Sequence, residues 1–288
     1  MSSSAKDSLL SLLAYLIFLN ACVAIVEFVL GQSIVAVEIG GFSFFRSTAF
    51  LAHPLNNALI TASLSLLLMR YTKIPEVLYV SVVILALFAF GGRAALGIFL
   101  LGNFMLDIYQ ILRLFLGEGL RYSKTKFAYM QALVYFSAIA VILTVVFSPI
   151  GERILSKLHI DNSAEARFDA FILLEQLSSS EWLFGASHGL LNDIVFYIGI
   201  NVVENYLIGW VLNFGLLGCI GLLFSYLSSP FYVDLLSKDG QLKLFLSVLF
   251  CISVTNNALT VKTPALMFLV MVLSCYYRSS KHRKKTYV

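Results

Sequence analysis

Apolar residues fall along the chain in long blocks that are separated by short polar stretches. A helix that crosses a bilayer needs about 20 mainly apolar residues, and these blocks approach or reach that length. The candidate spans are Leu9–Gly31, Pro54–Arg70, Ile74–Phe90, Ala94–Leu116, Phe127–Phe147, Glu204–Ser228, Leu242–Thr255 and Thr263–Tyr277. The pattern therefore predicts an all-α fold: a polytopic transmembrane helix bundle of about eight spans, with residues 1–288 forming a single integral membrane domain.

One polar segment, residues 148–203, is much longer than the usual connection between helices of about 2–8 residues. Within it, Ser163 is suited to cap a helix that runs from Ala164 to about Leu177, and Glu165 lies in the first turn, where a negative charge suits the helix dipole. We expect this helix to be amphipathic and to lie along the membrane surface.

Composition and charge fix an expected orientation. With 59% hydrophobic and only 12% charged residues, the chain does not have the polar skin of a soluble domain. The basic run from Lys281 to Lys285 directly follows an apolar block, and such clusters stay in the cytoplasm. Counting back from it leaves Arg70–Lys73, Leu120–Lys126 and Lys238–Lys243 inside, each with Lys or Arg. Both termini are thus expected to be cytoplasmic, residues 148–203 form a large extracytoplasmic loop, and nucleic acid is not an expected partner.

Basic residues on the outer side run against the positive-inside rule, and Arg93 is the most informative of them. It follows Gly91 and Gly92 at the boundary between two spans, where glycines allow a tight turn or the close approach of another group. Arg93 either extends its guanidinium to the interface or holds an anion, because a guanidinium can bind phosphate oxygens through two parallel hydrogen bonds.

Other outer-side polar residues suggest acid–base or binding roles. Arg46 and His53 precede Pro54, which suits the start of a helix, and His53 is either a cap or a catalytic group. Glu204, before a span, is a charge partner of arginines or a general base, and His188 is an alternative base. The scattered histidines and the absence of a DxD-like or HExxH motif predict metal independence.

The order of several short motifs resembles the O-antigen polymerase and O-antigen ligase superfamily of bacterial envelopes. The motifs are Arg46 with His53-Pro54-Leu55, Gly92-Arg93-Ala94-Ala95-Leu96, Arg167-Phe168, Phe184-Gly185 with Gly189, and Glu204-Asn205-Tyr206-Leu207 with Gly215 and Gly218. The resemblance extends from Phe44 to Ser274, and it rests on the order, spacing and outer-side placement of these motifs.

This resemblance implies an inverting glycosyltransferase of the bacterial inner (cytoplasmic) membrane that acts on sugars linked to undecaprenyl pyrophosphate and needs no cofactor. Arg93 and Arg167, with Arg46 in support, would bind the pyrophosphate, and His53 and Asn205 would bind substrate. Glu204 stands where the ligases have His, which favours a polymerase of O-antigen, capsule or exopolysaccharide. The implied partners are the lipid-linked oligosaccharide, membrane lipids, a chain-length regulator (co-polymerase) and the flippase of the pathway. A ligase-type transferase and a transporter or flippase of lipid-linked saccharides are the alternatives.

Overall fold

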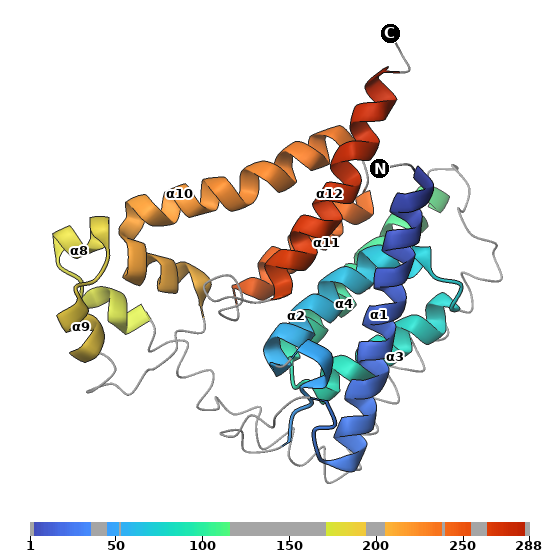
Figure 1. Ribbon diagram of the computed structural model, residues 1–288, viewed down its shortest axis with the longest axis horizontal. Coiled ribbons are helices and arrows are strands. Elements are labelled where there is room, and N and C mark those ends of the chain that lie inside the picture. Colours follow the sequence, from blue (N-terminus) through green and yellow to red (C-terminus); the bar gives the residue numbers. More distant parts are fainter. Residues whose placement is uncertain are drawn as a thin grey trace.

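The computed structural model describes residues 3–35, 45–51, 53–115, 171–193, 205–237, 240–254 and 264–285 (Figure 1). Within these ranges every regular element is a helix, so the all-α prediction is confirmed there. The α-helices are α1 (Ser3–Leu30), α2 (Pro54–Leu68), α3 (Glu76–Ala89), α4 (Arg93–Phe115), α8 (Ser179–Phe184), α9 (His188–Asp193), α10 (Tyr206–Ser237), α11 (Gly240–Ser253) and α12 (Pro264–Lys285). Two short 3₁₀ helices, η1 (Ala49–Leu51) and η2 (Met69–Tyr71), flank α2.

Seven of the eight predicted apolar segments coincide with α1, α2, α3, α4, α10, α11 and α12. The eighth, Phe127–Phe147, lies outside the described residues. In the described part of the chain, two helical stretches are long and apolar enough to cross a membrane, Ser4–Leu30 and Tyr206–Ser228. The other apolar helices are shorter, so the number of spans stays a prediction.

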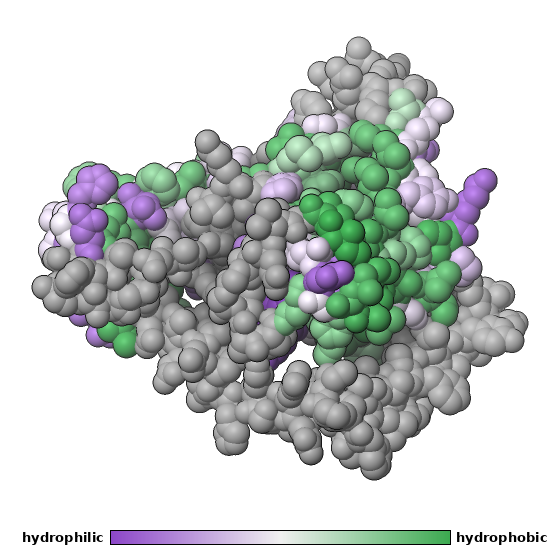
Figure 2. All heavy atoms as spheres, turned by 60° about the horizontal axis from the view of Figure 1, so that its bottom comes forward, coloured by the Kyte–Doolittle hydropathy of each residue, from purple (hydrophilic) through white to green (hydrophobic). Residues whose placement is uncertain are grey.

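Helix α2 is the centre of the larger helical bundle. Every residue of α2 except Leu55 is buried, because α1, α3, α4, α11 and α12 all pack against it. Helix α2 is thus buried on nearly every side, although five of its 15 residues are polar, and it forms the interior of the bundle. The outer helices, by contrast, expose large apolar side chains: on α1, Leu12, Leu16, Leu19 and Val26 are each about half exposed. Figure 2 shows such side chains over much of the described surface. Soluble proteins seldom expose so much apolar surface.

One end of this bundle gathers basic and phenolic side chains from α1, η2 and α12. The ammonium of Lys6 on α1 lies 4.0 Å from the ring centroid of Tyr276 on α12, and the guanidinium of Arg70 donates a hydrogen bond to the hydroxyl of Tyr276. The hydroxyls of Tyr71 and Tyr276 are 3.2 Å apart. We call this the Tyr276 end. Lys6, Arg70 and the end of α12 are all expected in the cytoplasm, and which end faces the cytoplasm stays a prediction.

The opposite end contains the end of α1, residues 45–51, the start of α2 and the turn between α3 and α4. There the Ser47 amide donates to the Ala89 carbonyl at 3.1 Å, which ties the residues before α2 to the end of α3. We call this the Arg46 end. Arg46, His53 and Arg93 all lie at this end, and the sequence predicts that all three lie on one side of the membrane.

A smaller unit is built around a bend in α10. Gly215 has φ 66° and ψ −178°, which interrupts the helix. Trp210, before the bend, stacks on Tyr226, after it, with ring centroids 5.2 Å apart. Helices α8 and α9 lie beside this bend (Figure 1).

The predicted surface helix of residues 164–177 is described only at its end, where residues 171–175 are helical. Leu173 and Leu177 are buried in the core of the smaller unit, with Trp210 and other residues of α10, while Phe171 and Ile172 are about half exposed. Of the two leucines, only Leu173 lies in the helix, so the described end of the helix has one buried and two exposed apolar side chains, and its amphipathic character and its place on the membrane surface stay predictions.

Candidate functional site

The buried carboxylate of Glu27 organises the Arg46 end. Its Oε1 accepts hydrogen bonds from the amides of Ile34 (2.8 Å) and Val35 (3.3 Å). Its Oε2 accepts from the Ser47 hydroxyl (2.5 Å) and from the amides of Thr48 (3.1 Å) and Ala49 (2.9 Å). All five partners are donors, which suits an ionised carboxylate, and the Glu27 side chain is fully buried.

Two buried amide side chains extend this network into the bundle. Asn57 on α2 donates to the Thr48 carbonyl at 2.6 Å, and Asn20 on α1 donates to Asn57 Oδ1 at 3.0 Å. Asn20 also accepts from the amide of Phe50 at 3.1 Å. Residues 47–50 are therefore held from both α1 and α2. A buried polar network in which each partner is satisfied rigidifies its surroundings.

The segment held by Glu27 adopts a conformation that alanine rarely takes. Ala49 has φ 36° and is, among the described residues, the one non-glycine residue with positive φ. Such backbone costs about 1–3 kcal/mol and persists where the surroundings impose it. Here the Glu27 contacts to the amides of residues 48 and 49 impose it.

Arg46 lies directly against the glycine turn that precedes Arg93. A Cβ at Gly91 would sit 3.0 Å from Nε of Arg46, and one at Gly92 would sit 2.4 Å from the Cβ of Ala58 on α2. Gly91 has φ 70°, which glycine adopts without strain. The expectation that these glycines allow another group to approach closely is confirmed: Arg46 approaches one, and α2 approaches the other.

The Arg46 end is also the positive end of two helix dipoles. Both α2 and α4 begin there, and Gly92, which directly precedes α4, lies against Ala58 in the second turn of α2. Arg93 is the first residue of α4 and is exposed. An arginine in the first turn opposes the dipole, which is not what helix stability would select. Helix N-termini and guanidinium groups together favour an anion.

His53 is the N-cap of α2. Its Nδ1 accepts a hydrogen bond from the Leu55 amide at 3.3 Å, and Pro54 follows at the first helical position. The capping alternative for His53 is thus confirmed. A substrate-binding role for His53 stays a prediction.

Asn205 is likewise a cap, at the start of α10. Its Oδ1 accepts from the amides of Leu207 (2.9 Å) and Ile208 (3.3 Å), which satisfies two of the first N–H groups of the helix. Its neighbour Glu204 and the arginine Arg167 lie outside the described residues. Their predicted roles as base and pyrophosphate ligand stay predictions.

His188 lies in the smaller unit, at the exposed first residue of α9. The link between α8 and α9 is held by Glu181, whose carboxylate accepts from the Ser187 amide at 3.0 Å and from the Ser178 hydroxyl at 2.8 Å. These bonds, with that of the Ser187 amide foremost, lower the pKa of Glu181 to about 2. Figure 1 shows α9 apart from the first turn of α2. The structure thus brings Arg46, His53 and Arg93 together, and it places His188 and Asn205 in the other unit.

Two glycines from distant motifs meet in that unit. A Cβ at Gly185 would lie 2.8 Å from the Asn213 carbonyl oxygen, and one at Gly215 would lie 2.2 Å from the Leu183 carbonyl oxygen. The Ala186 amide donates to the Leu212 carbonyl at 2.7 Å. The backbone after α8 therefore packs directly on the backbone at the bend of α10.

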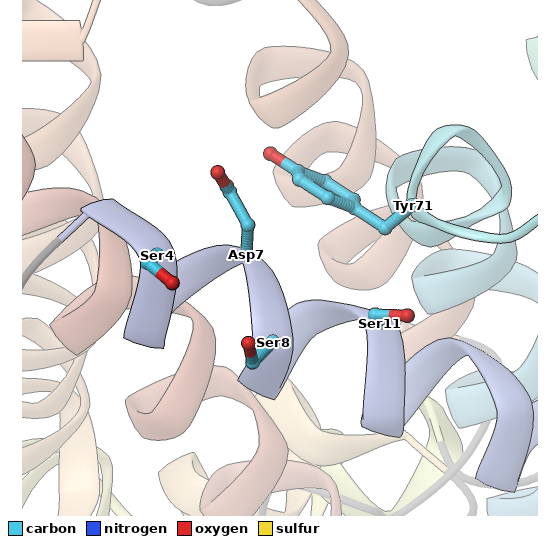
Figure 3. A pocket seen from close by; sticks show the side chains of 5 residues that line it. All are labelled: Ser4, Asp7, Ser8, Ser11 and Tyr71. Atoms are coloured by element: carbon cyan, nitrogen blue, oxygen red, sulfur yellow. The ribbon is translucent and has the colours of Figure 1, made fainter.

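A polar pocket of about 760 Å³ lies near the Tyr276 end, and no sequence motif pointed to it. Ser4, Asp7, Ser8 and Ser11 line it from one face of α1, and Tyr71 lines it from η2. In Figure 3 the Asp7 carboxylate and the Tyr71 hydroxyl point to the same side of α1. Spacings of three and four residues put these serines and Asp7 on one helical face. This spacing is the sequence feature from which the pocket could have been predicted.

Glu27 is the main residue that sequence reasoning missed at the Arg46 end. It is an ionisable residue inside a predicted span, which alone marks a position of interest. Its partners at residues 34–49 follow it in the sequence, so no local spacing reveals that they surround it.

Among the described residues, no three His, Cys, Asp or Glu side chains come together as a potential metal-binding group. Comparison of the chain with protein-family models, with curated proteins and with solved structures finds no match.

Proposed function

We propose that this chain is a membrane-embedded polysaccharide polymerase, an inverting and metal-independent glycosyltransferase of the bacterial inner membrane. It would join undecaprenyl-pyrophosphate-linked oligosaccharide repeat units at the outer face. The observation that carries the proposal is the meeting of Arg46, the glycine turn before Arg93 and the N-termini of α2 and α4 at one end of the bundle. A diphosphate at the edge of a low-dielectric membrane needs such a concentration of positive charge.

In the proposed reaction, the acceptor sugar hydroxyl attacks the anomeric carbon of the donor, and the bond from that carbon to the pyrophosphate oxygen breaks. Arg93 and Arg46, with Arg167, stabilise the negative charge that develops on the leaving undecaprenyl pyrophosphate. Glu204 or His188 accepts the proton of the attacking hydroxyl. Asn205 and His53 contribute to binding the glycan. The exposed apolar faces of the bundle accommodate the polyprenyl chain.

The substitution Arg93→Lys tests the proposal. It keeps the positive charge and loses the paired hydrogen bonds of the guanidinium, so polymer elongation in cells should fall at least tenfold while membrane insertion is unchanged. Polymer length is read on gels of extracted polysaccharide, and insertion by membrane fractionation. Arg70→Lys, at the Tyr276 end, is the matched control and should leave elongation intact. Full-length polymer from Arg93→Lys would count strongly against an arginine clamp.

A transporter or flippase of lipid-linked saccharides is the second candidate, and the bend of α10 at Gly215 favours it. Interrupted helices line the substrate sites of many transporters. The two candidates differ in where the substrate accumulates when the protein is inactive. Loss of a polymerase leaves single lipid-linked repeat units on the outer face, whereas loss of a flippase traps them on the inner face. A ligase-type transferase differs from both, because its loss leaves polymer attached to the lipid carrier.

A further inference from the structure

We infer that Glu27 is a positioning residue that holds Arg46 beside the turn of Arg93, so that the two arginines form one anion-binding site. The inference rests on the proposed function for the identity of the anion. It begins with the Glu27 carboxylate, which receives five hydrogen bonds from residues 34–49. A buried charge is tolerated only when it is paired or fully hydrogen-bonded, and Glu27 meets the second condition.

Glu27 acts on Arg46 through Ser47, the residue that follows Arg46 in the sequence. Its Oε2 binds the Ser47 hydroxyl at 2.5 Å, while the Ser47 amide donates to the Ala89 carbonyl at 3.1 Å. Ser47 is therefore fixed to α1 by its side chain and to the end of α3 by its backbone. This double attachment sets where the adjacent Arg46 leaves the chain and places its side chain on Gly91.

The strained backbone at Ala49 indicates that contacts with Glu27 hold this loop in a conformation that it would not adopt by itself. The amides of Thr48 and Ala49 both point at Oε2 of Glu27, and Ala49 has φ 36°. Successive amides that converge in this way form a small anion-binding concavity. Glu27 occupies that concavity from within the protein, so it shapes the loop without facing the external anion.

A purely electrostatic role and a positioning role of Glu27 predict opposite effects of Glu27→Gln on anion binding. If Glu27 acted only as a nearby negative charge, its removal would tighten the binding of an anion to the arginines. If Glu27 positions Arg46, the NH2 group of Gln would face donors in either orientation, the amides of residues 34 and 35 or the donors of residues 47–49, so the loop would loosen and anion binding would weaken. A loss of roughly tenfold in affinity corresponds to the loss of about one hydrogen bond to a charged group.

The experiment uses the purified full chain in nanodiscs with farnesyl pyrophosphate as the probe. Calorimetric titration gives its affinity, and hydrogen exchange measures the amides of residues 45–51. We expect Glu27→Gln to lower the affinity about tenfold and to speed exchange in that segment, and Glu27→Asp and Ser47→Ala to have smaller effects in the same direction. Glu76→Gln, at the far end of α3, is the control and should change neither quantity.

Unchanged or tighter binding by Glu27→Gln, with binding by the wild type intact, overturns the inference. Unchanged exchange in residues 45–51 also overturns it, because Glu27 then does not hold the loop. If Glu27→Gln does not fold, Ser47→Ala decides the matter in the same two measurements. If the wild type does not bind the probe, the proposed function fails, and the effect of Glu27→Gln on exchange in residues 45–51 still decides separately whether Glu27 holds the loop.

Discussion

His53 and Pro54 together determine where α2 begins. The imidazole satisfies the amide of Leu55, and the proline occupies the first helical position, where its missing N–H leaves no partner unsatisfied. Capping in this way requires only an acceptor of suitable reach. Other short polar residues fulfil the same role at helix starts.

Replacing His53 therefore separates its structural from its chemical role. His53→Asn should retain the cap and the thermal stability of the detergent-solubilised protein, whereas His53→Ala should lose about 1 kcal/mol. Melting followed by circular dichroism provides the comparison. If His53 also binds substrate, polymer elongation falls in both variants. If elongation falls only in the destabilised variant His53→Ala, the role of His53 is limited to capping α2.

For single residues, the sequence predicted those roles that depend on the conformational properties of the residue itself. Pro54 marked the start of α2, and Gly91 with Gly92 marked a close approach, because both properties belong to the residues themselves. Glu27 was not predicted. Its role depends on five donors that follow it along the chain, and hydropathy treats it only as an interruption of an apolar block.

Among the elements, α10 departs most from its sequence prediction. An apolar block with internal glycines predicts a continuous span, since glycine hardly changes the hydropathy of the block. The structure instead bends at Gly215, where φ 66° and ψ −178° define a backbone region open essentially to glycine alone. The bend receives the backbone after α8, and that partner is separated from it by some 30 residues of sequence.

We expect Gly215→Ala to destabilise the packing of α8 on α10. The added methyl group would lie 2.2 Å from the Leu183 carbonyl oxygen, and strain and overpacking together should cost about 2–4 kcal/mol. Limited proteolysis between residues 171 and 193 reports the loss. Gly221→Ala in the same helix meets nothing within 4 Å and should be neutral or mildly stabilising. Equal protease resistance in the two variants would contradict the close contact.

The positions of the helices were largely predictable, and their mutual arrangement was not. Block length and polar interruptions locate seven helices to within a few residues at most boundaries. In an apolar chain, however, the hydrophobic pattern does not say which face meets which neighbour. The central place of α2 follows instead from its buried small and polar residues, such as Asn57 and Thr61, which pair with Asn20 on α1.

The molecule as a whole has two chemically different ends. Lys6, Arg70 and Tyr276 mark one, and Arg46, His53 and Arg93 mark the other. The positive-inside rule predicts that the first end faces the cytoplasm, because α12 ends there in the basic run from Lys281 to Lys285.

This orientation is testable with single cysteines in a background where the four native cysteines are replaced. A membrane-impermeant maleimide added to intact spheroplasts should label Phe50→Cys, and it should label Ser4→Cys only after permeabilisation. Both side chains are exposed, so access depends on the side of the membrane. The reverse pattern would invert the topology, and labelling of both from outside would exclude α1 as a span.

The burial of α2 also has a consequence for how the protein is made. With 15 residues it is about 22 Å long, shorter than a hydrocarbon layer of about 30 Å, and it carries Asn56, Asn57, Thr61, Ser63 and Ser65. The transfer of such a segment from the translocon into lipid, without a partner helix, brings little gain in free energy. Helix α1, which has the length and apolarity to insert first, offers Asn20 as a partner, so α2 is expected to be retained until α1 and α3 can receive it during biogenesis.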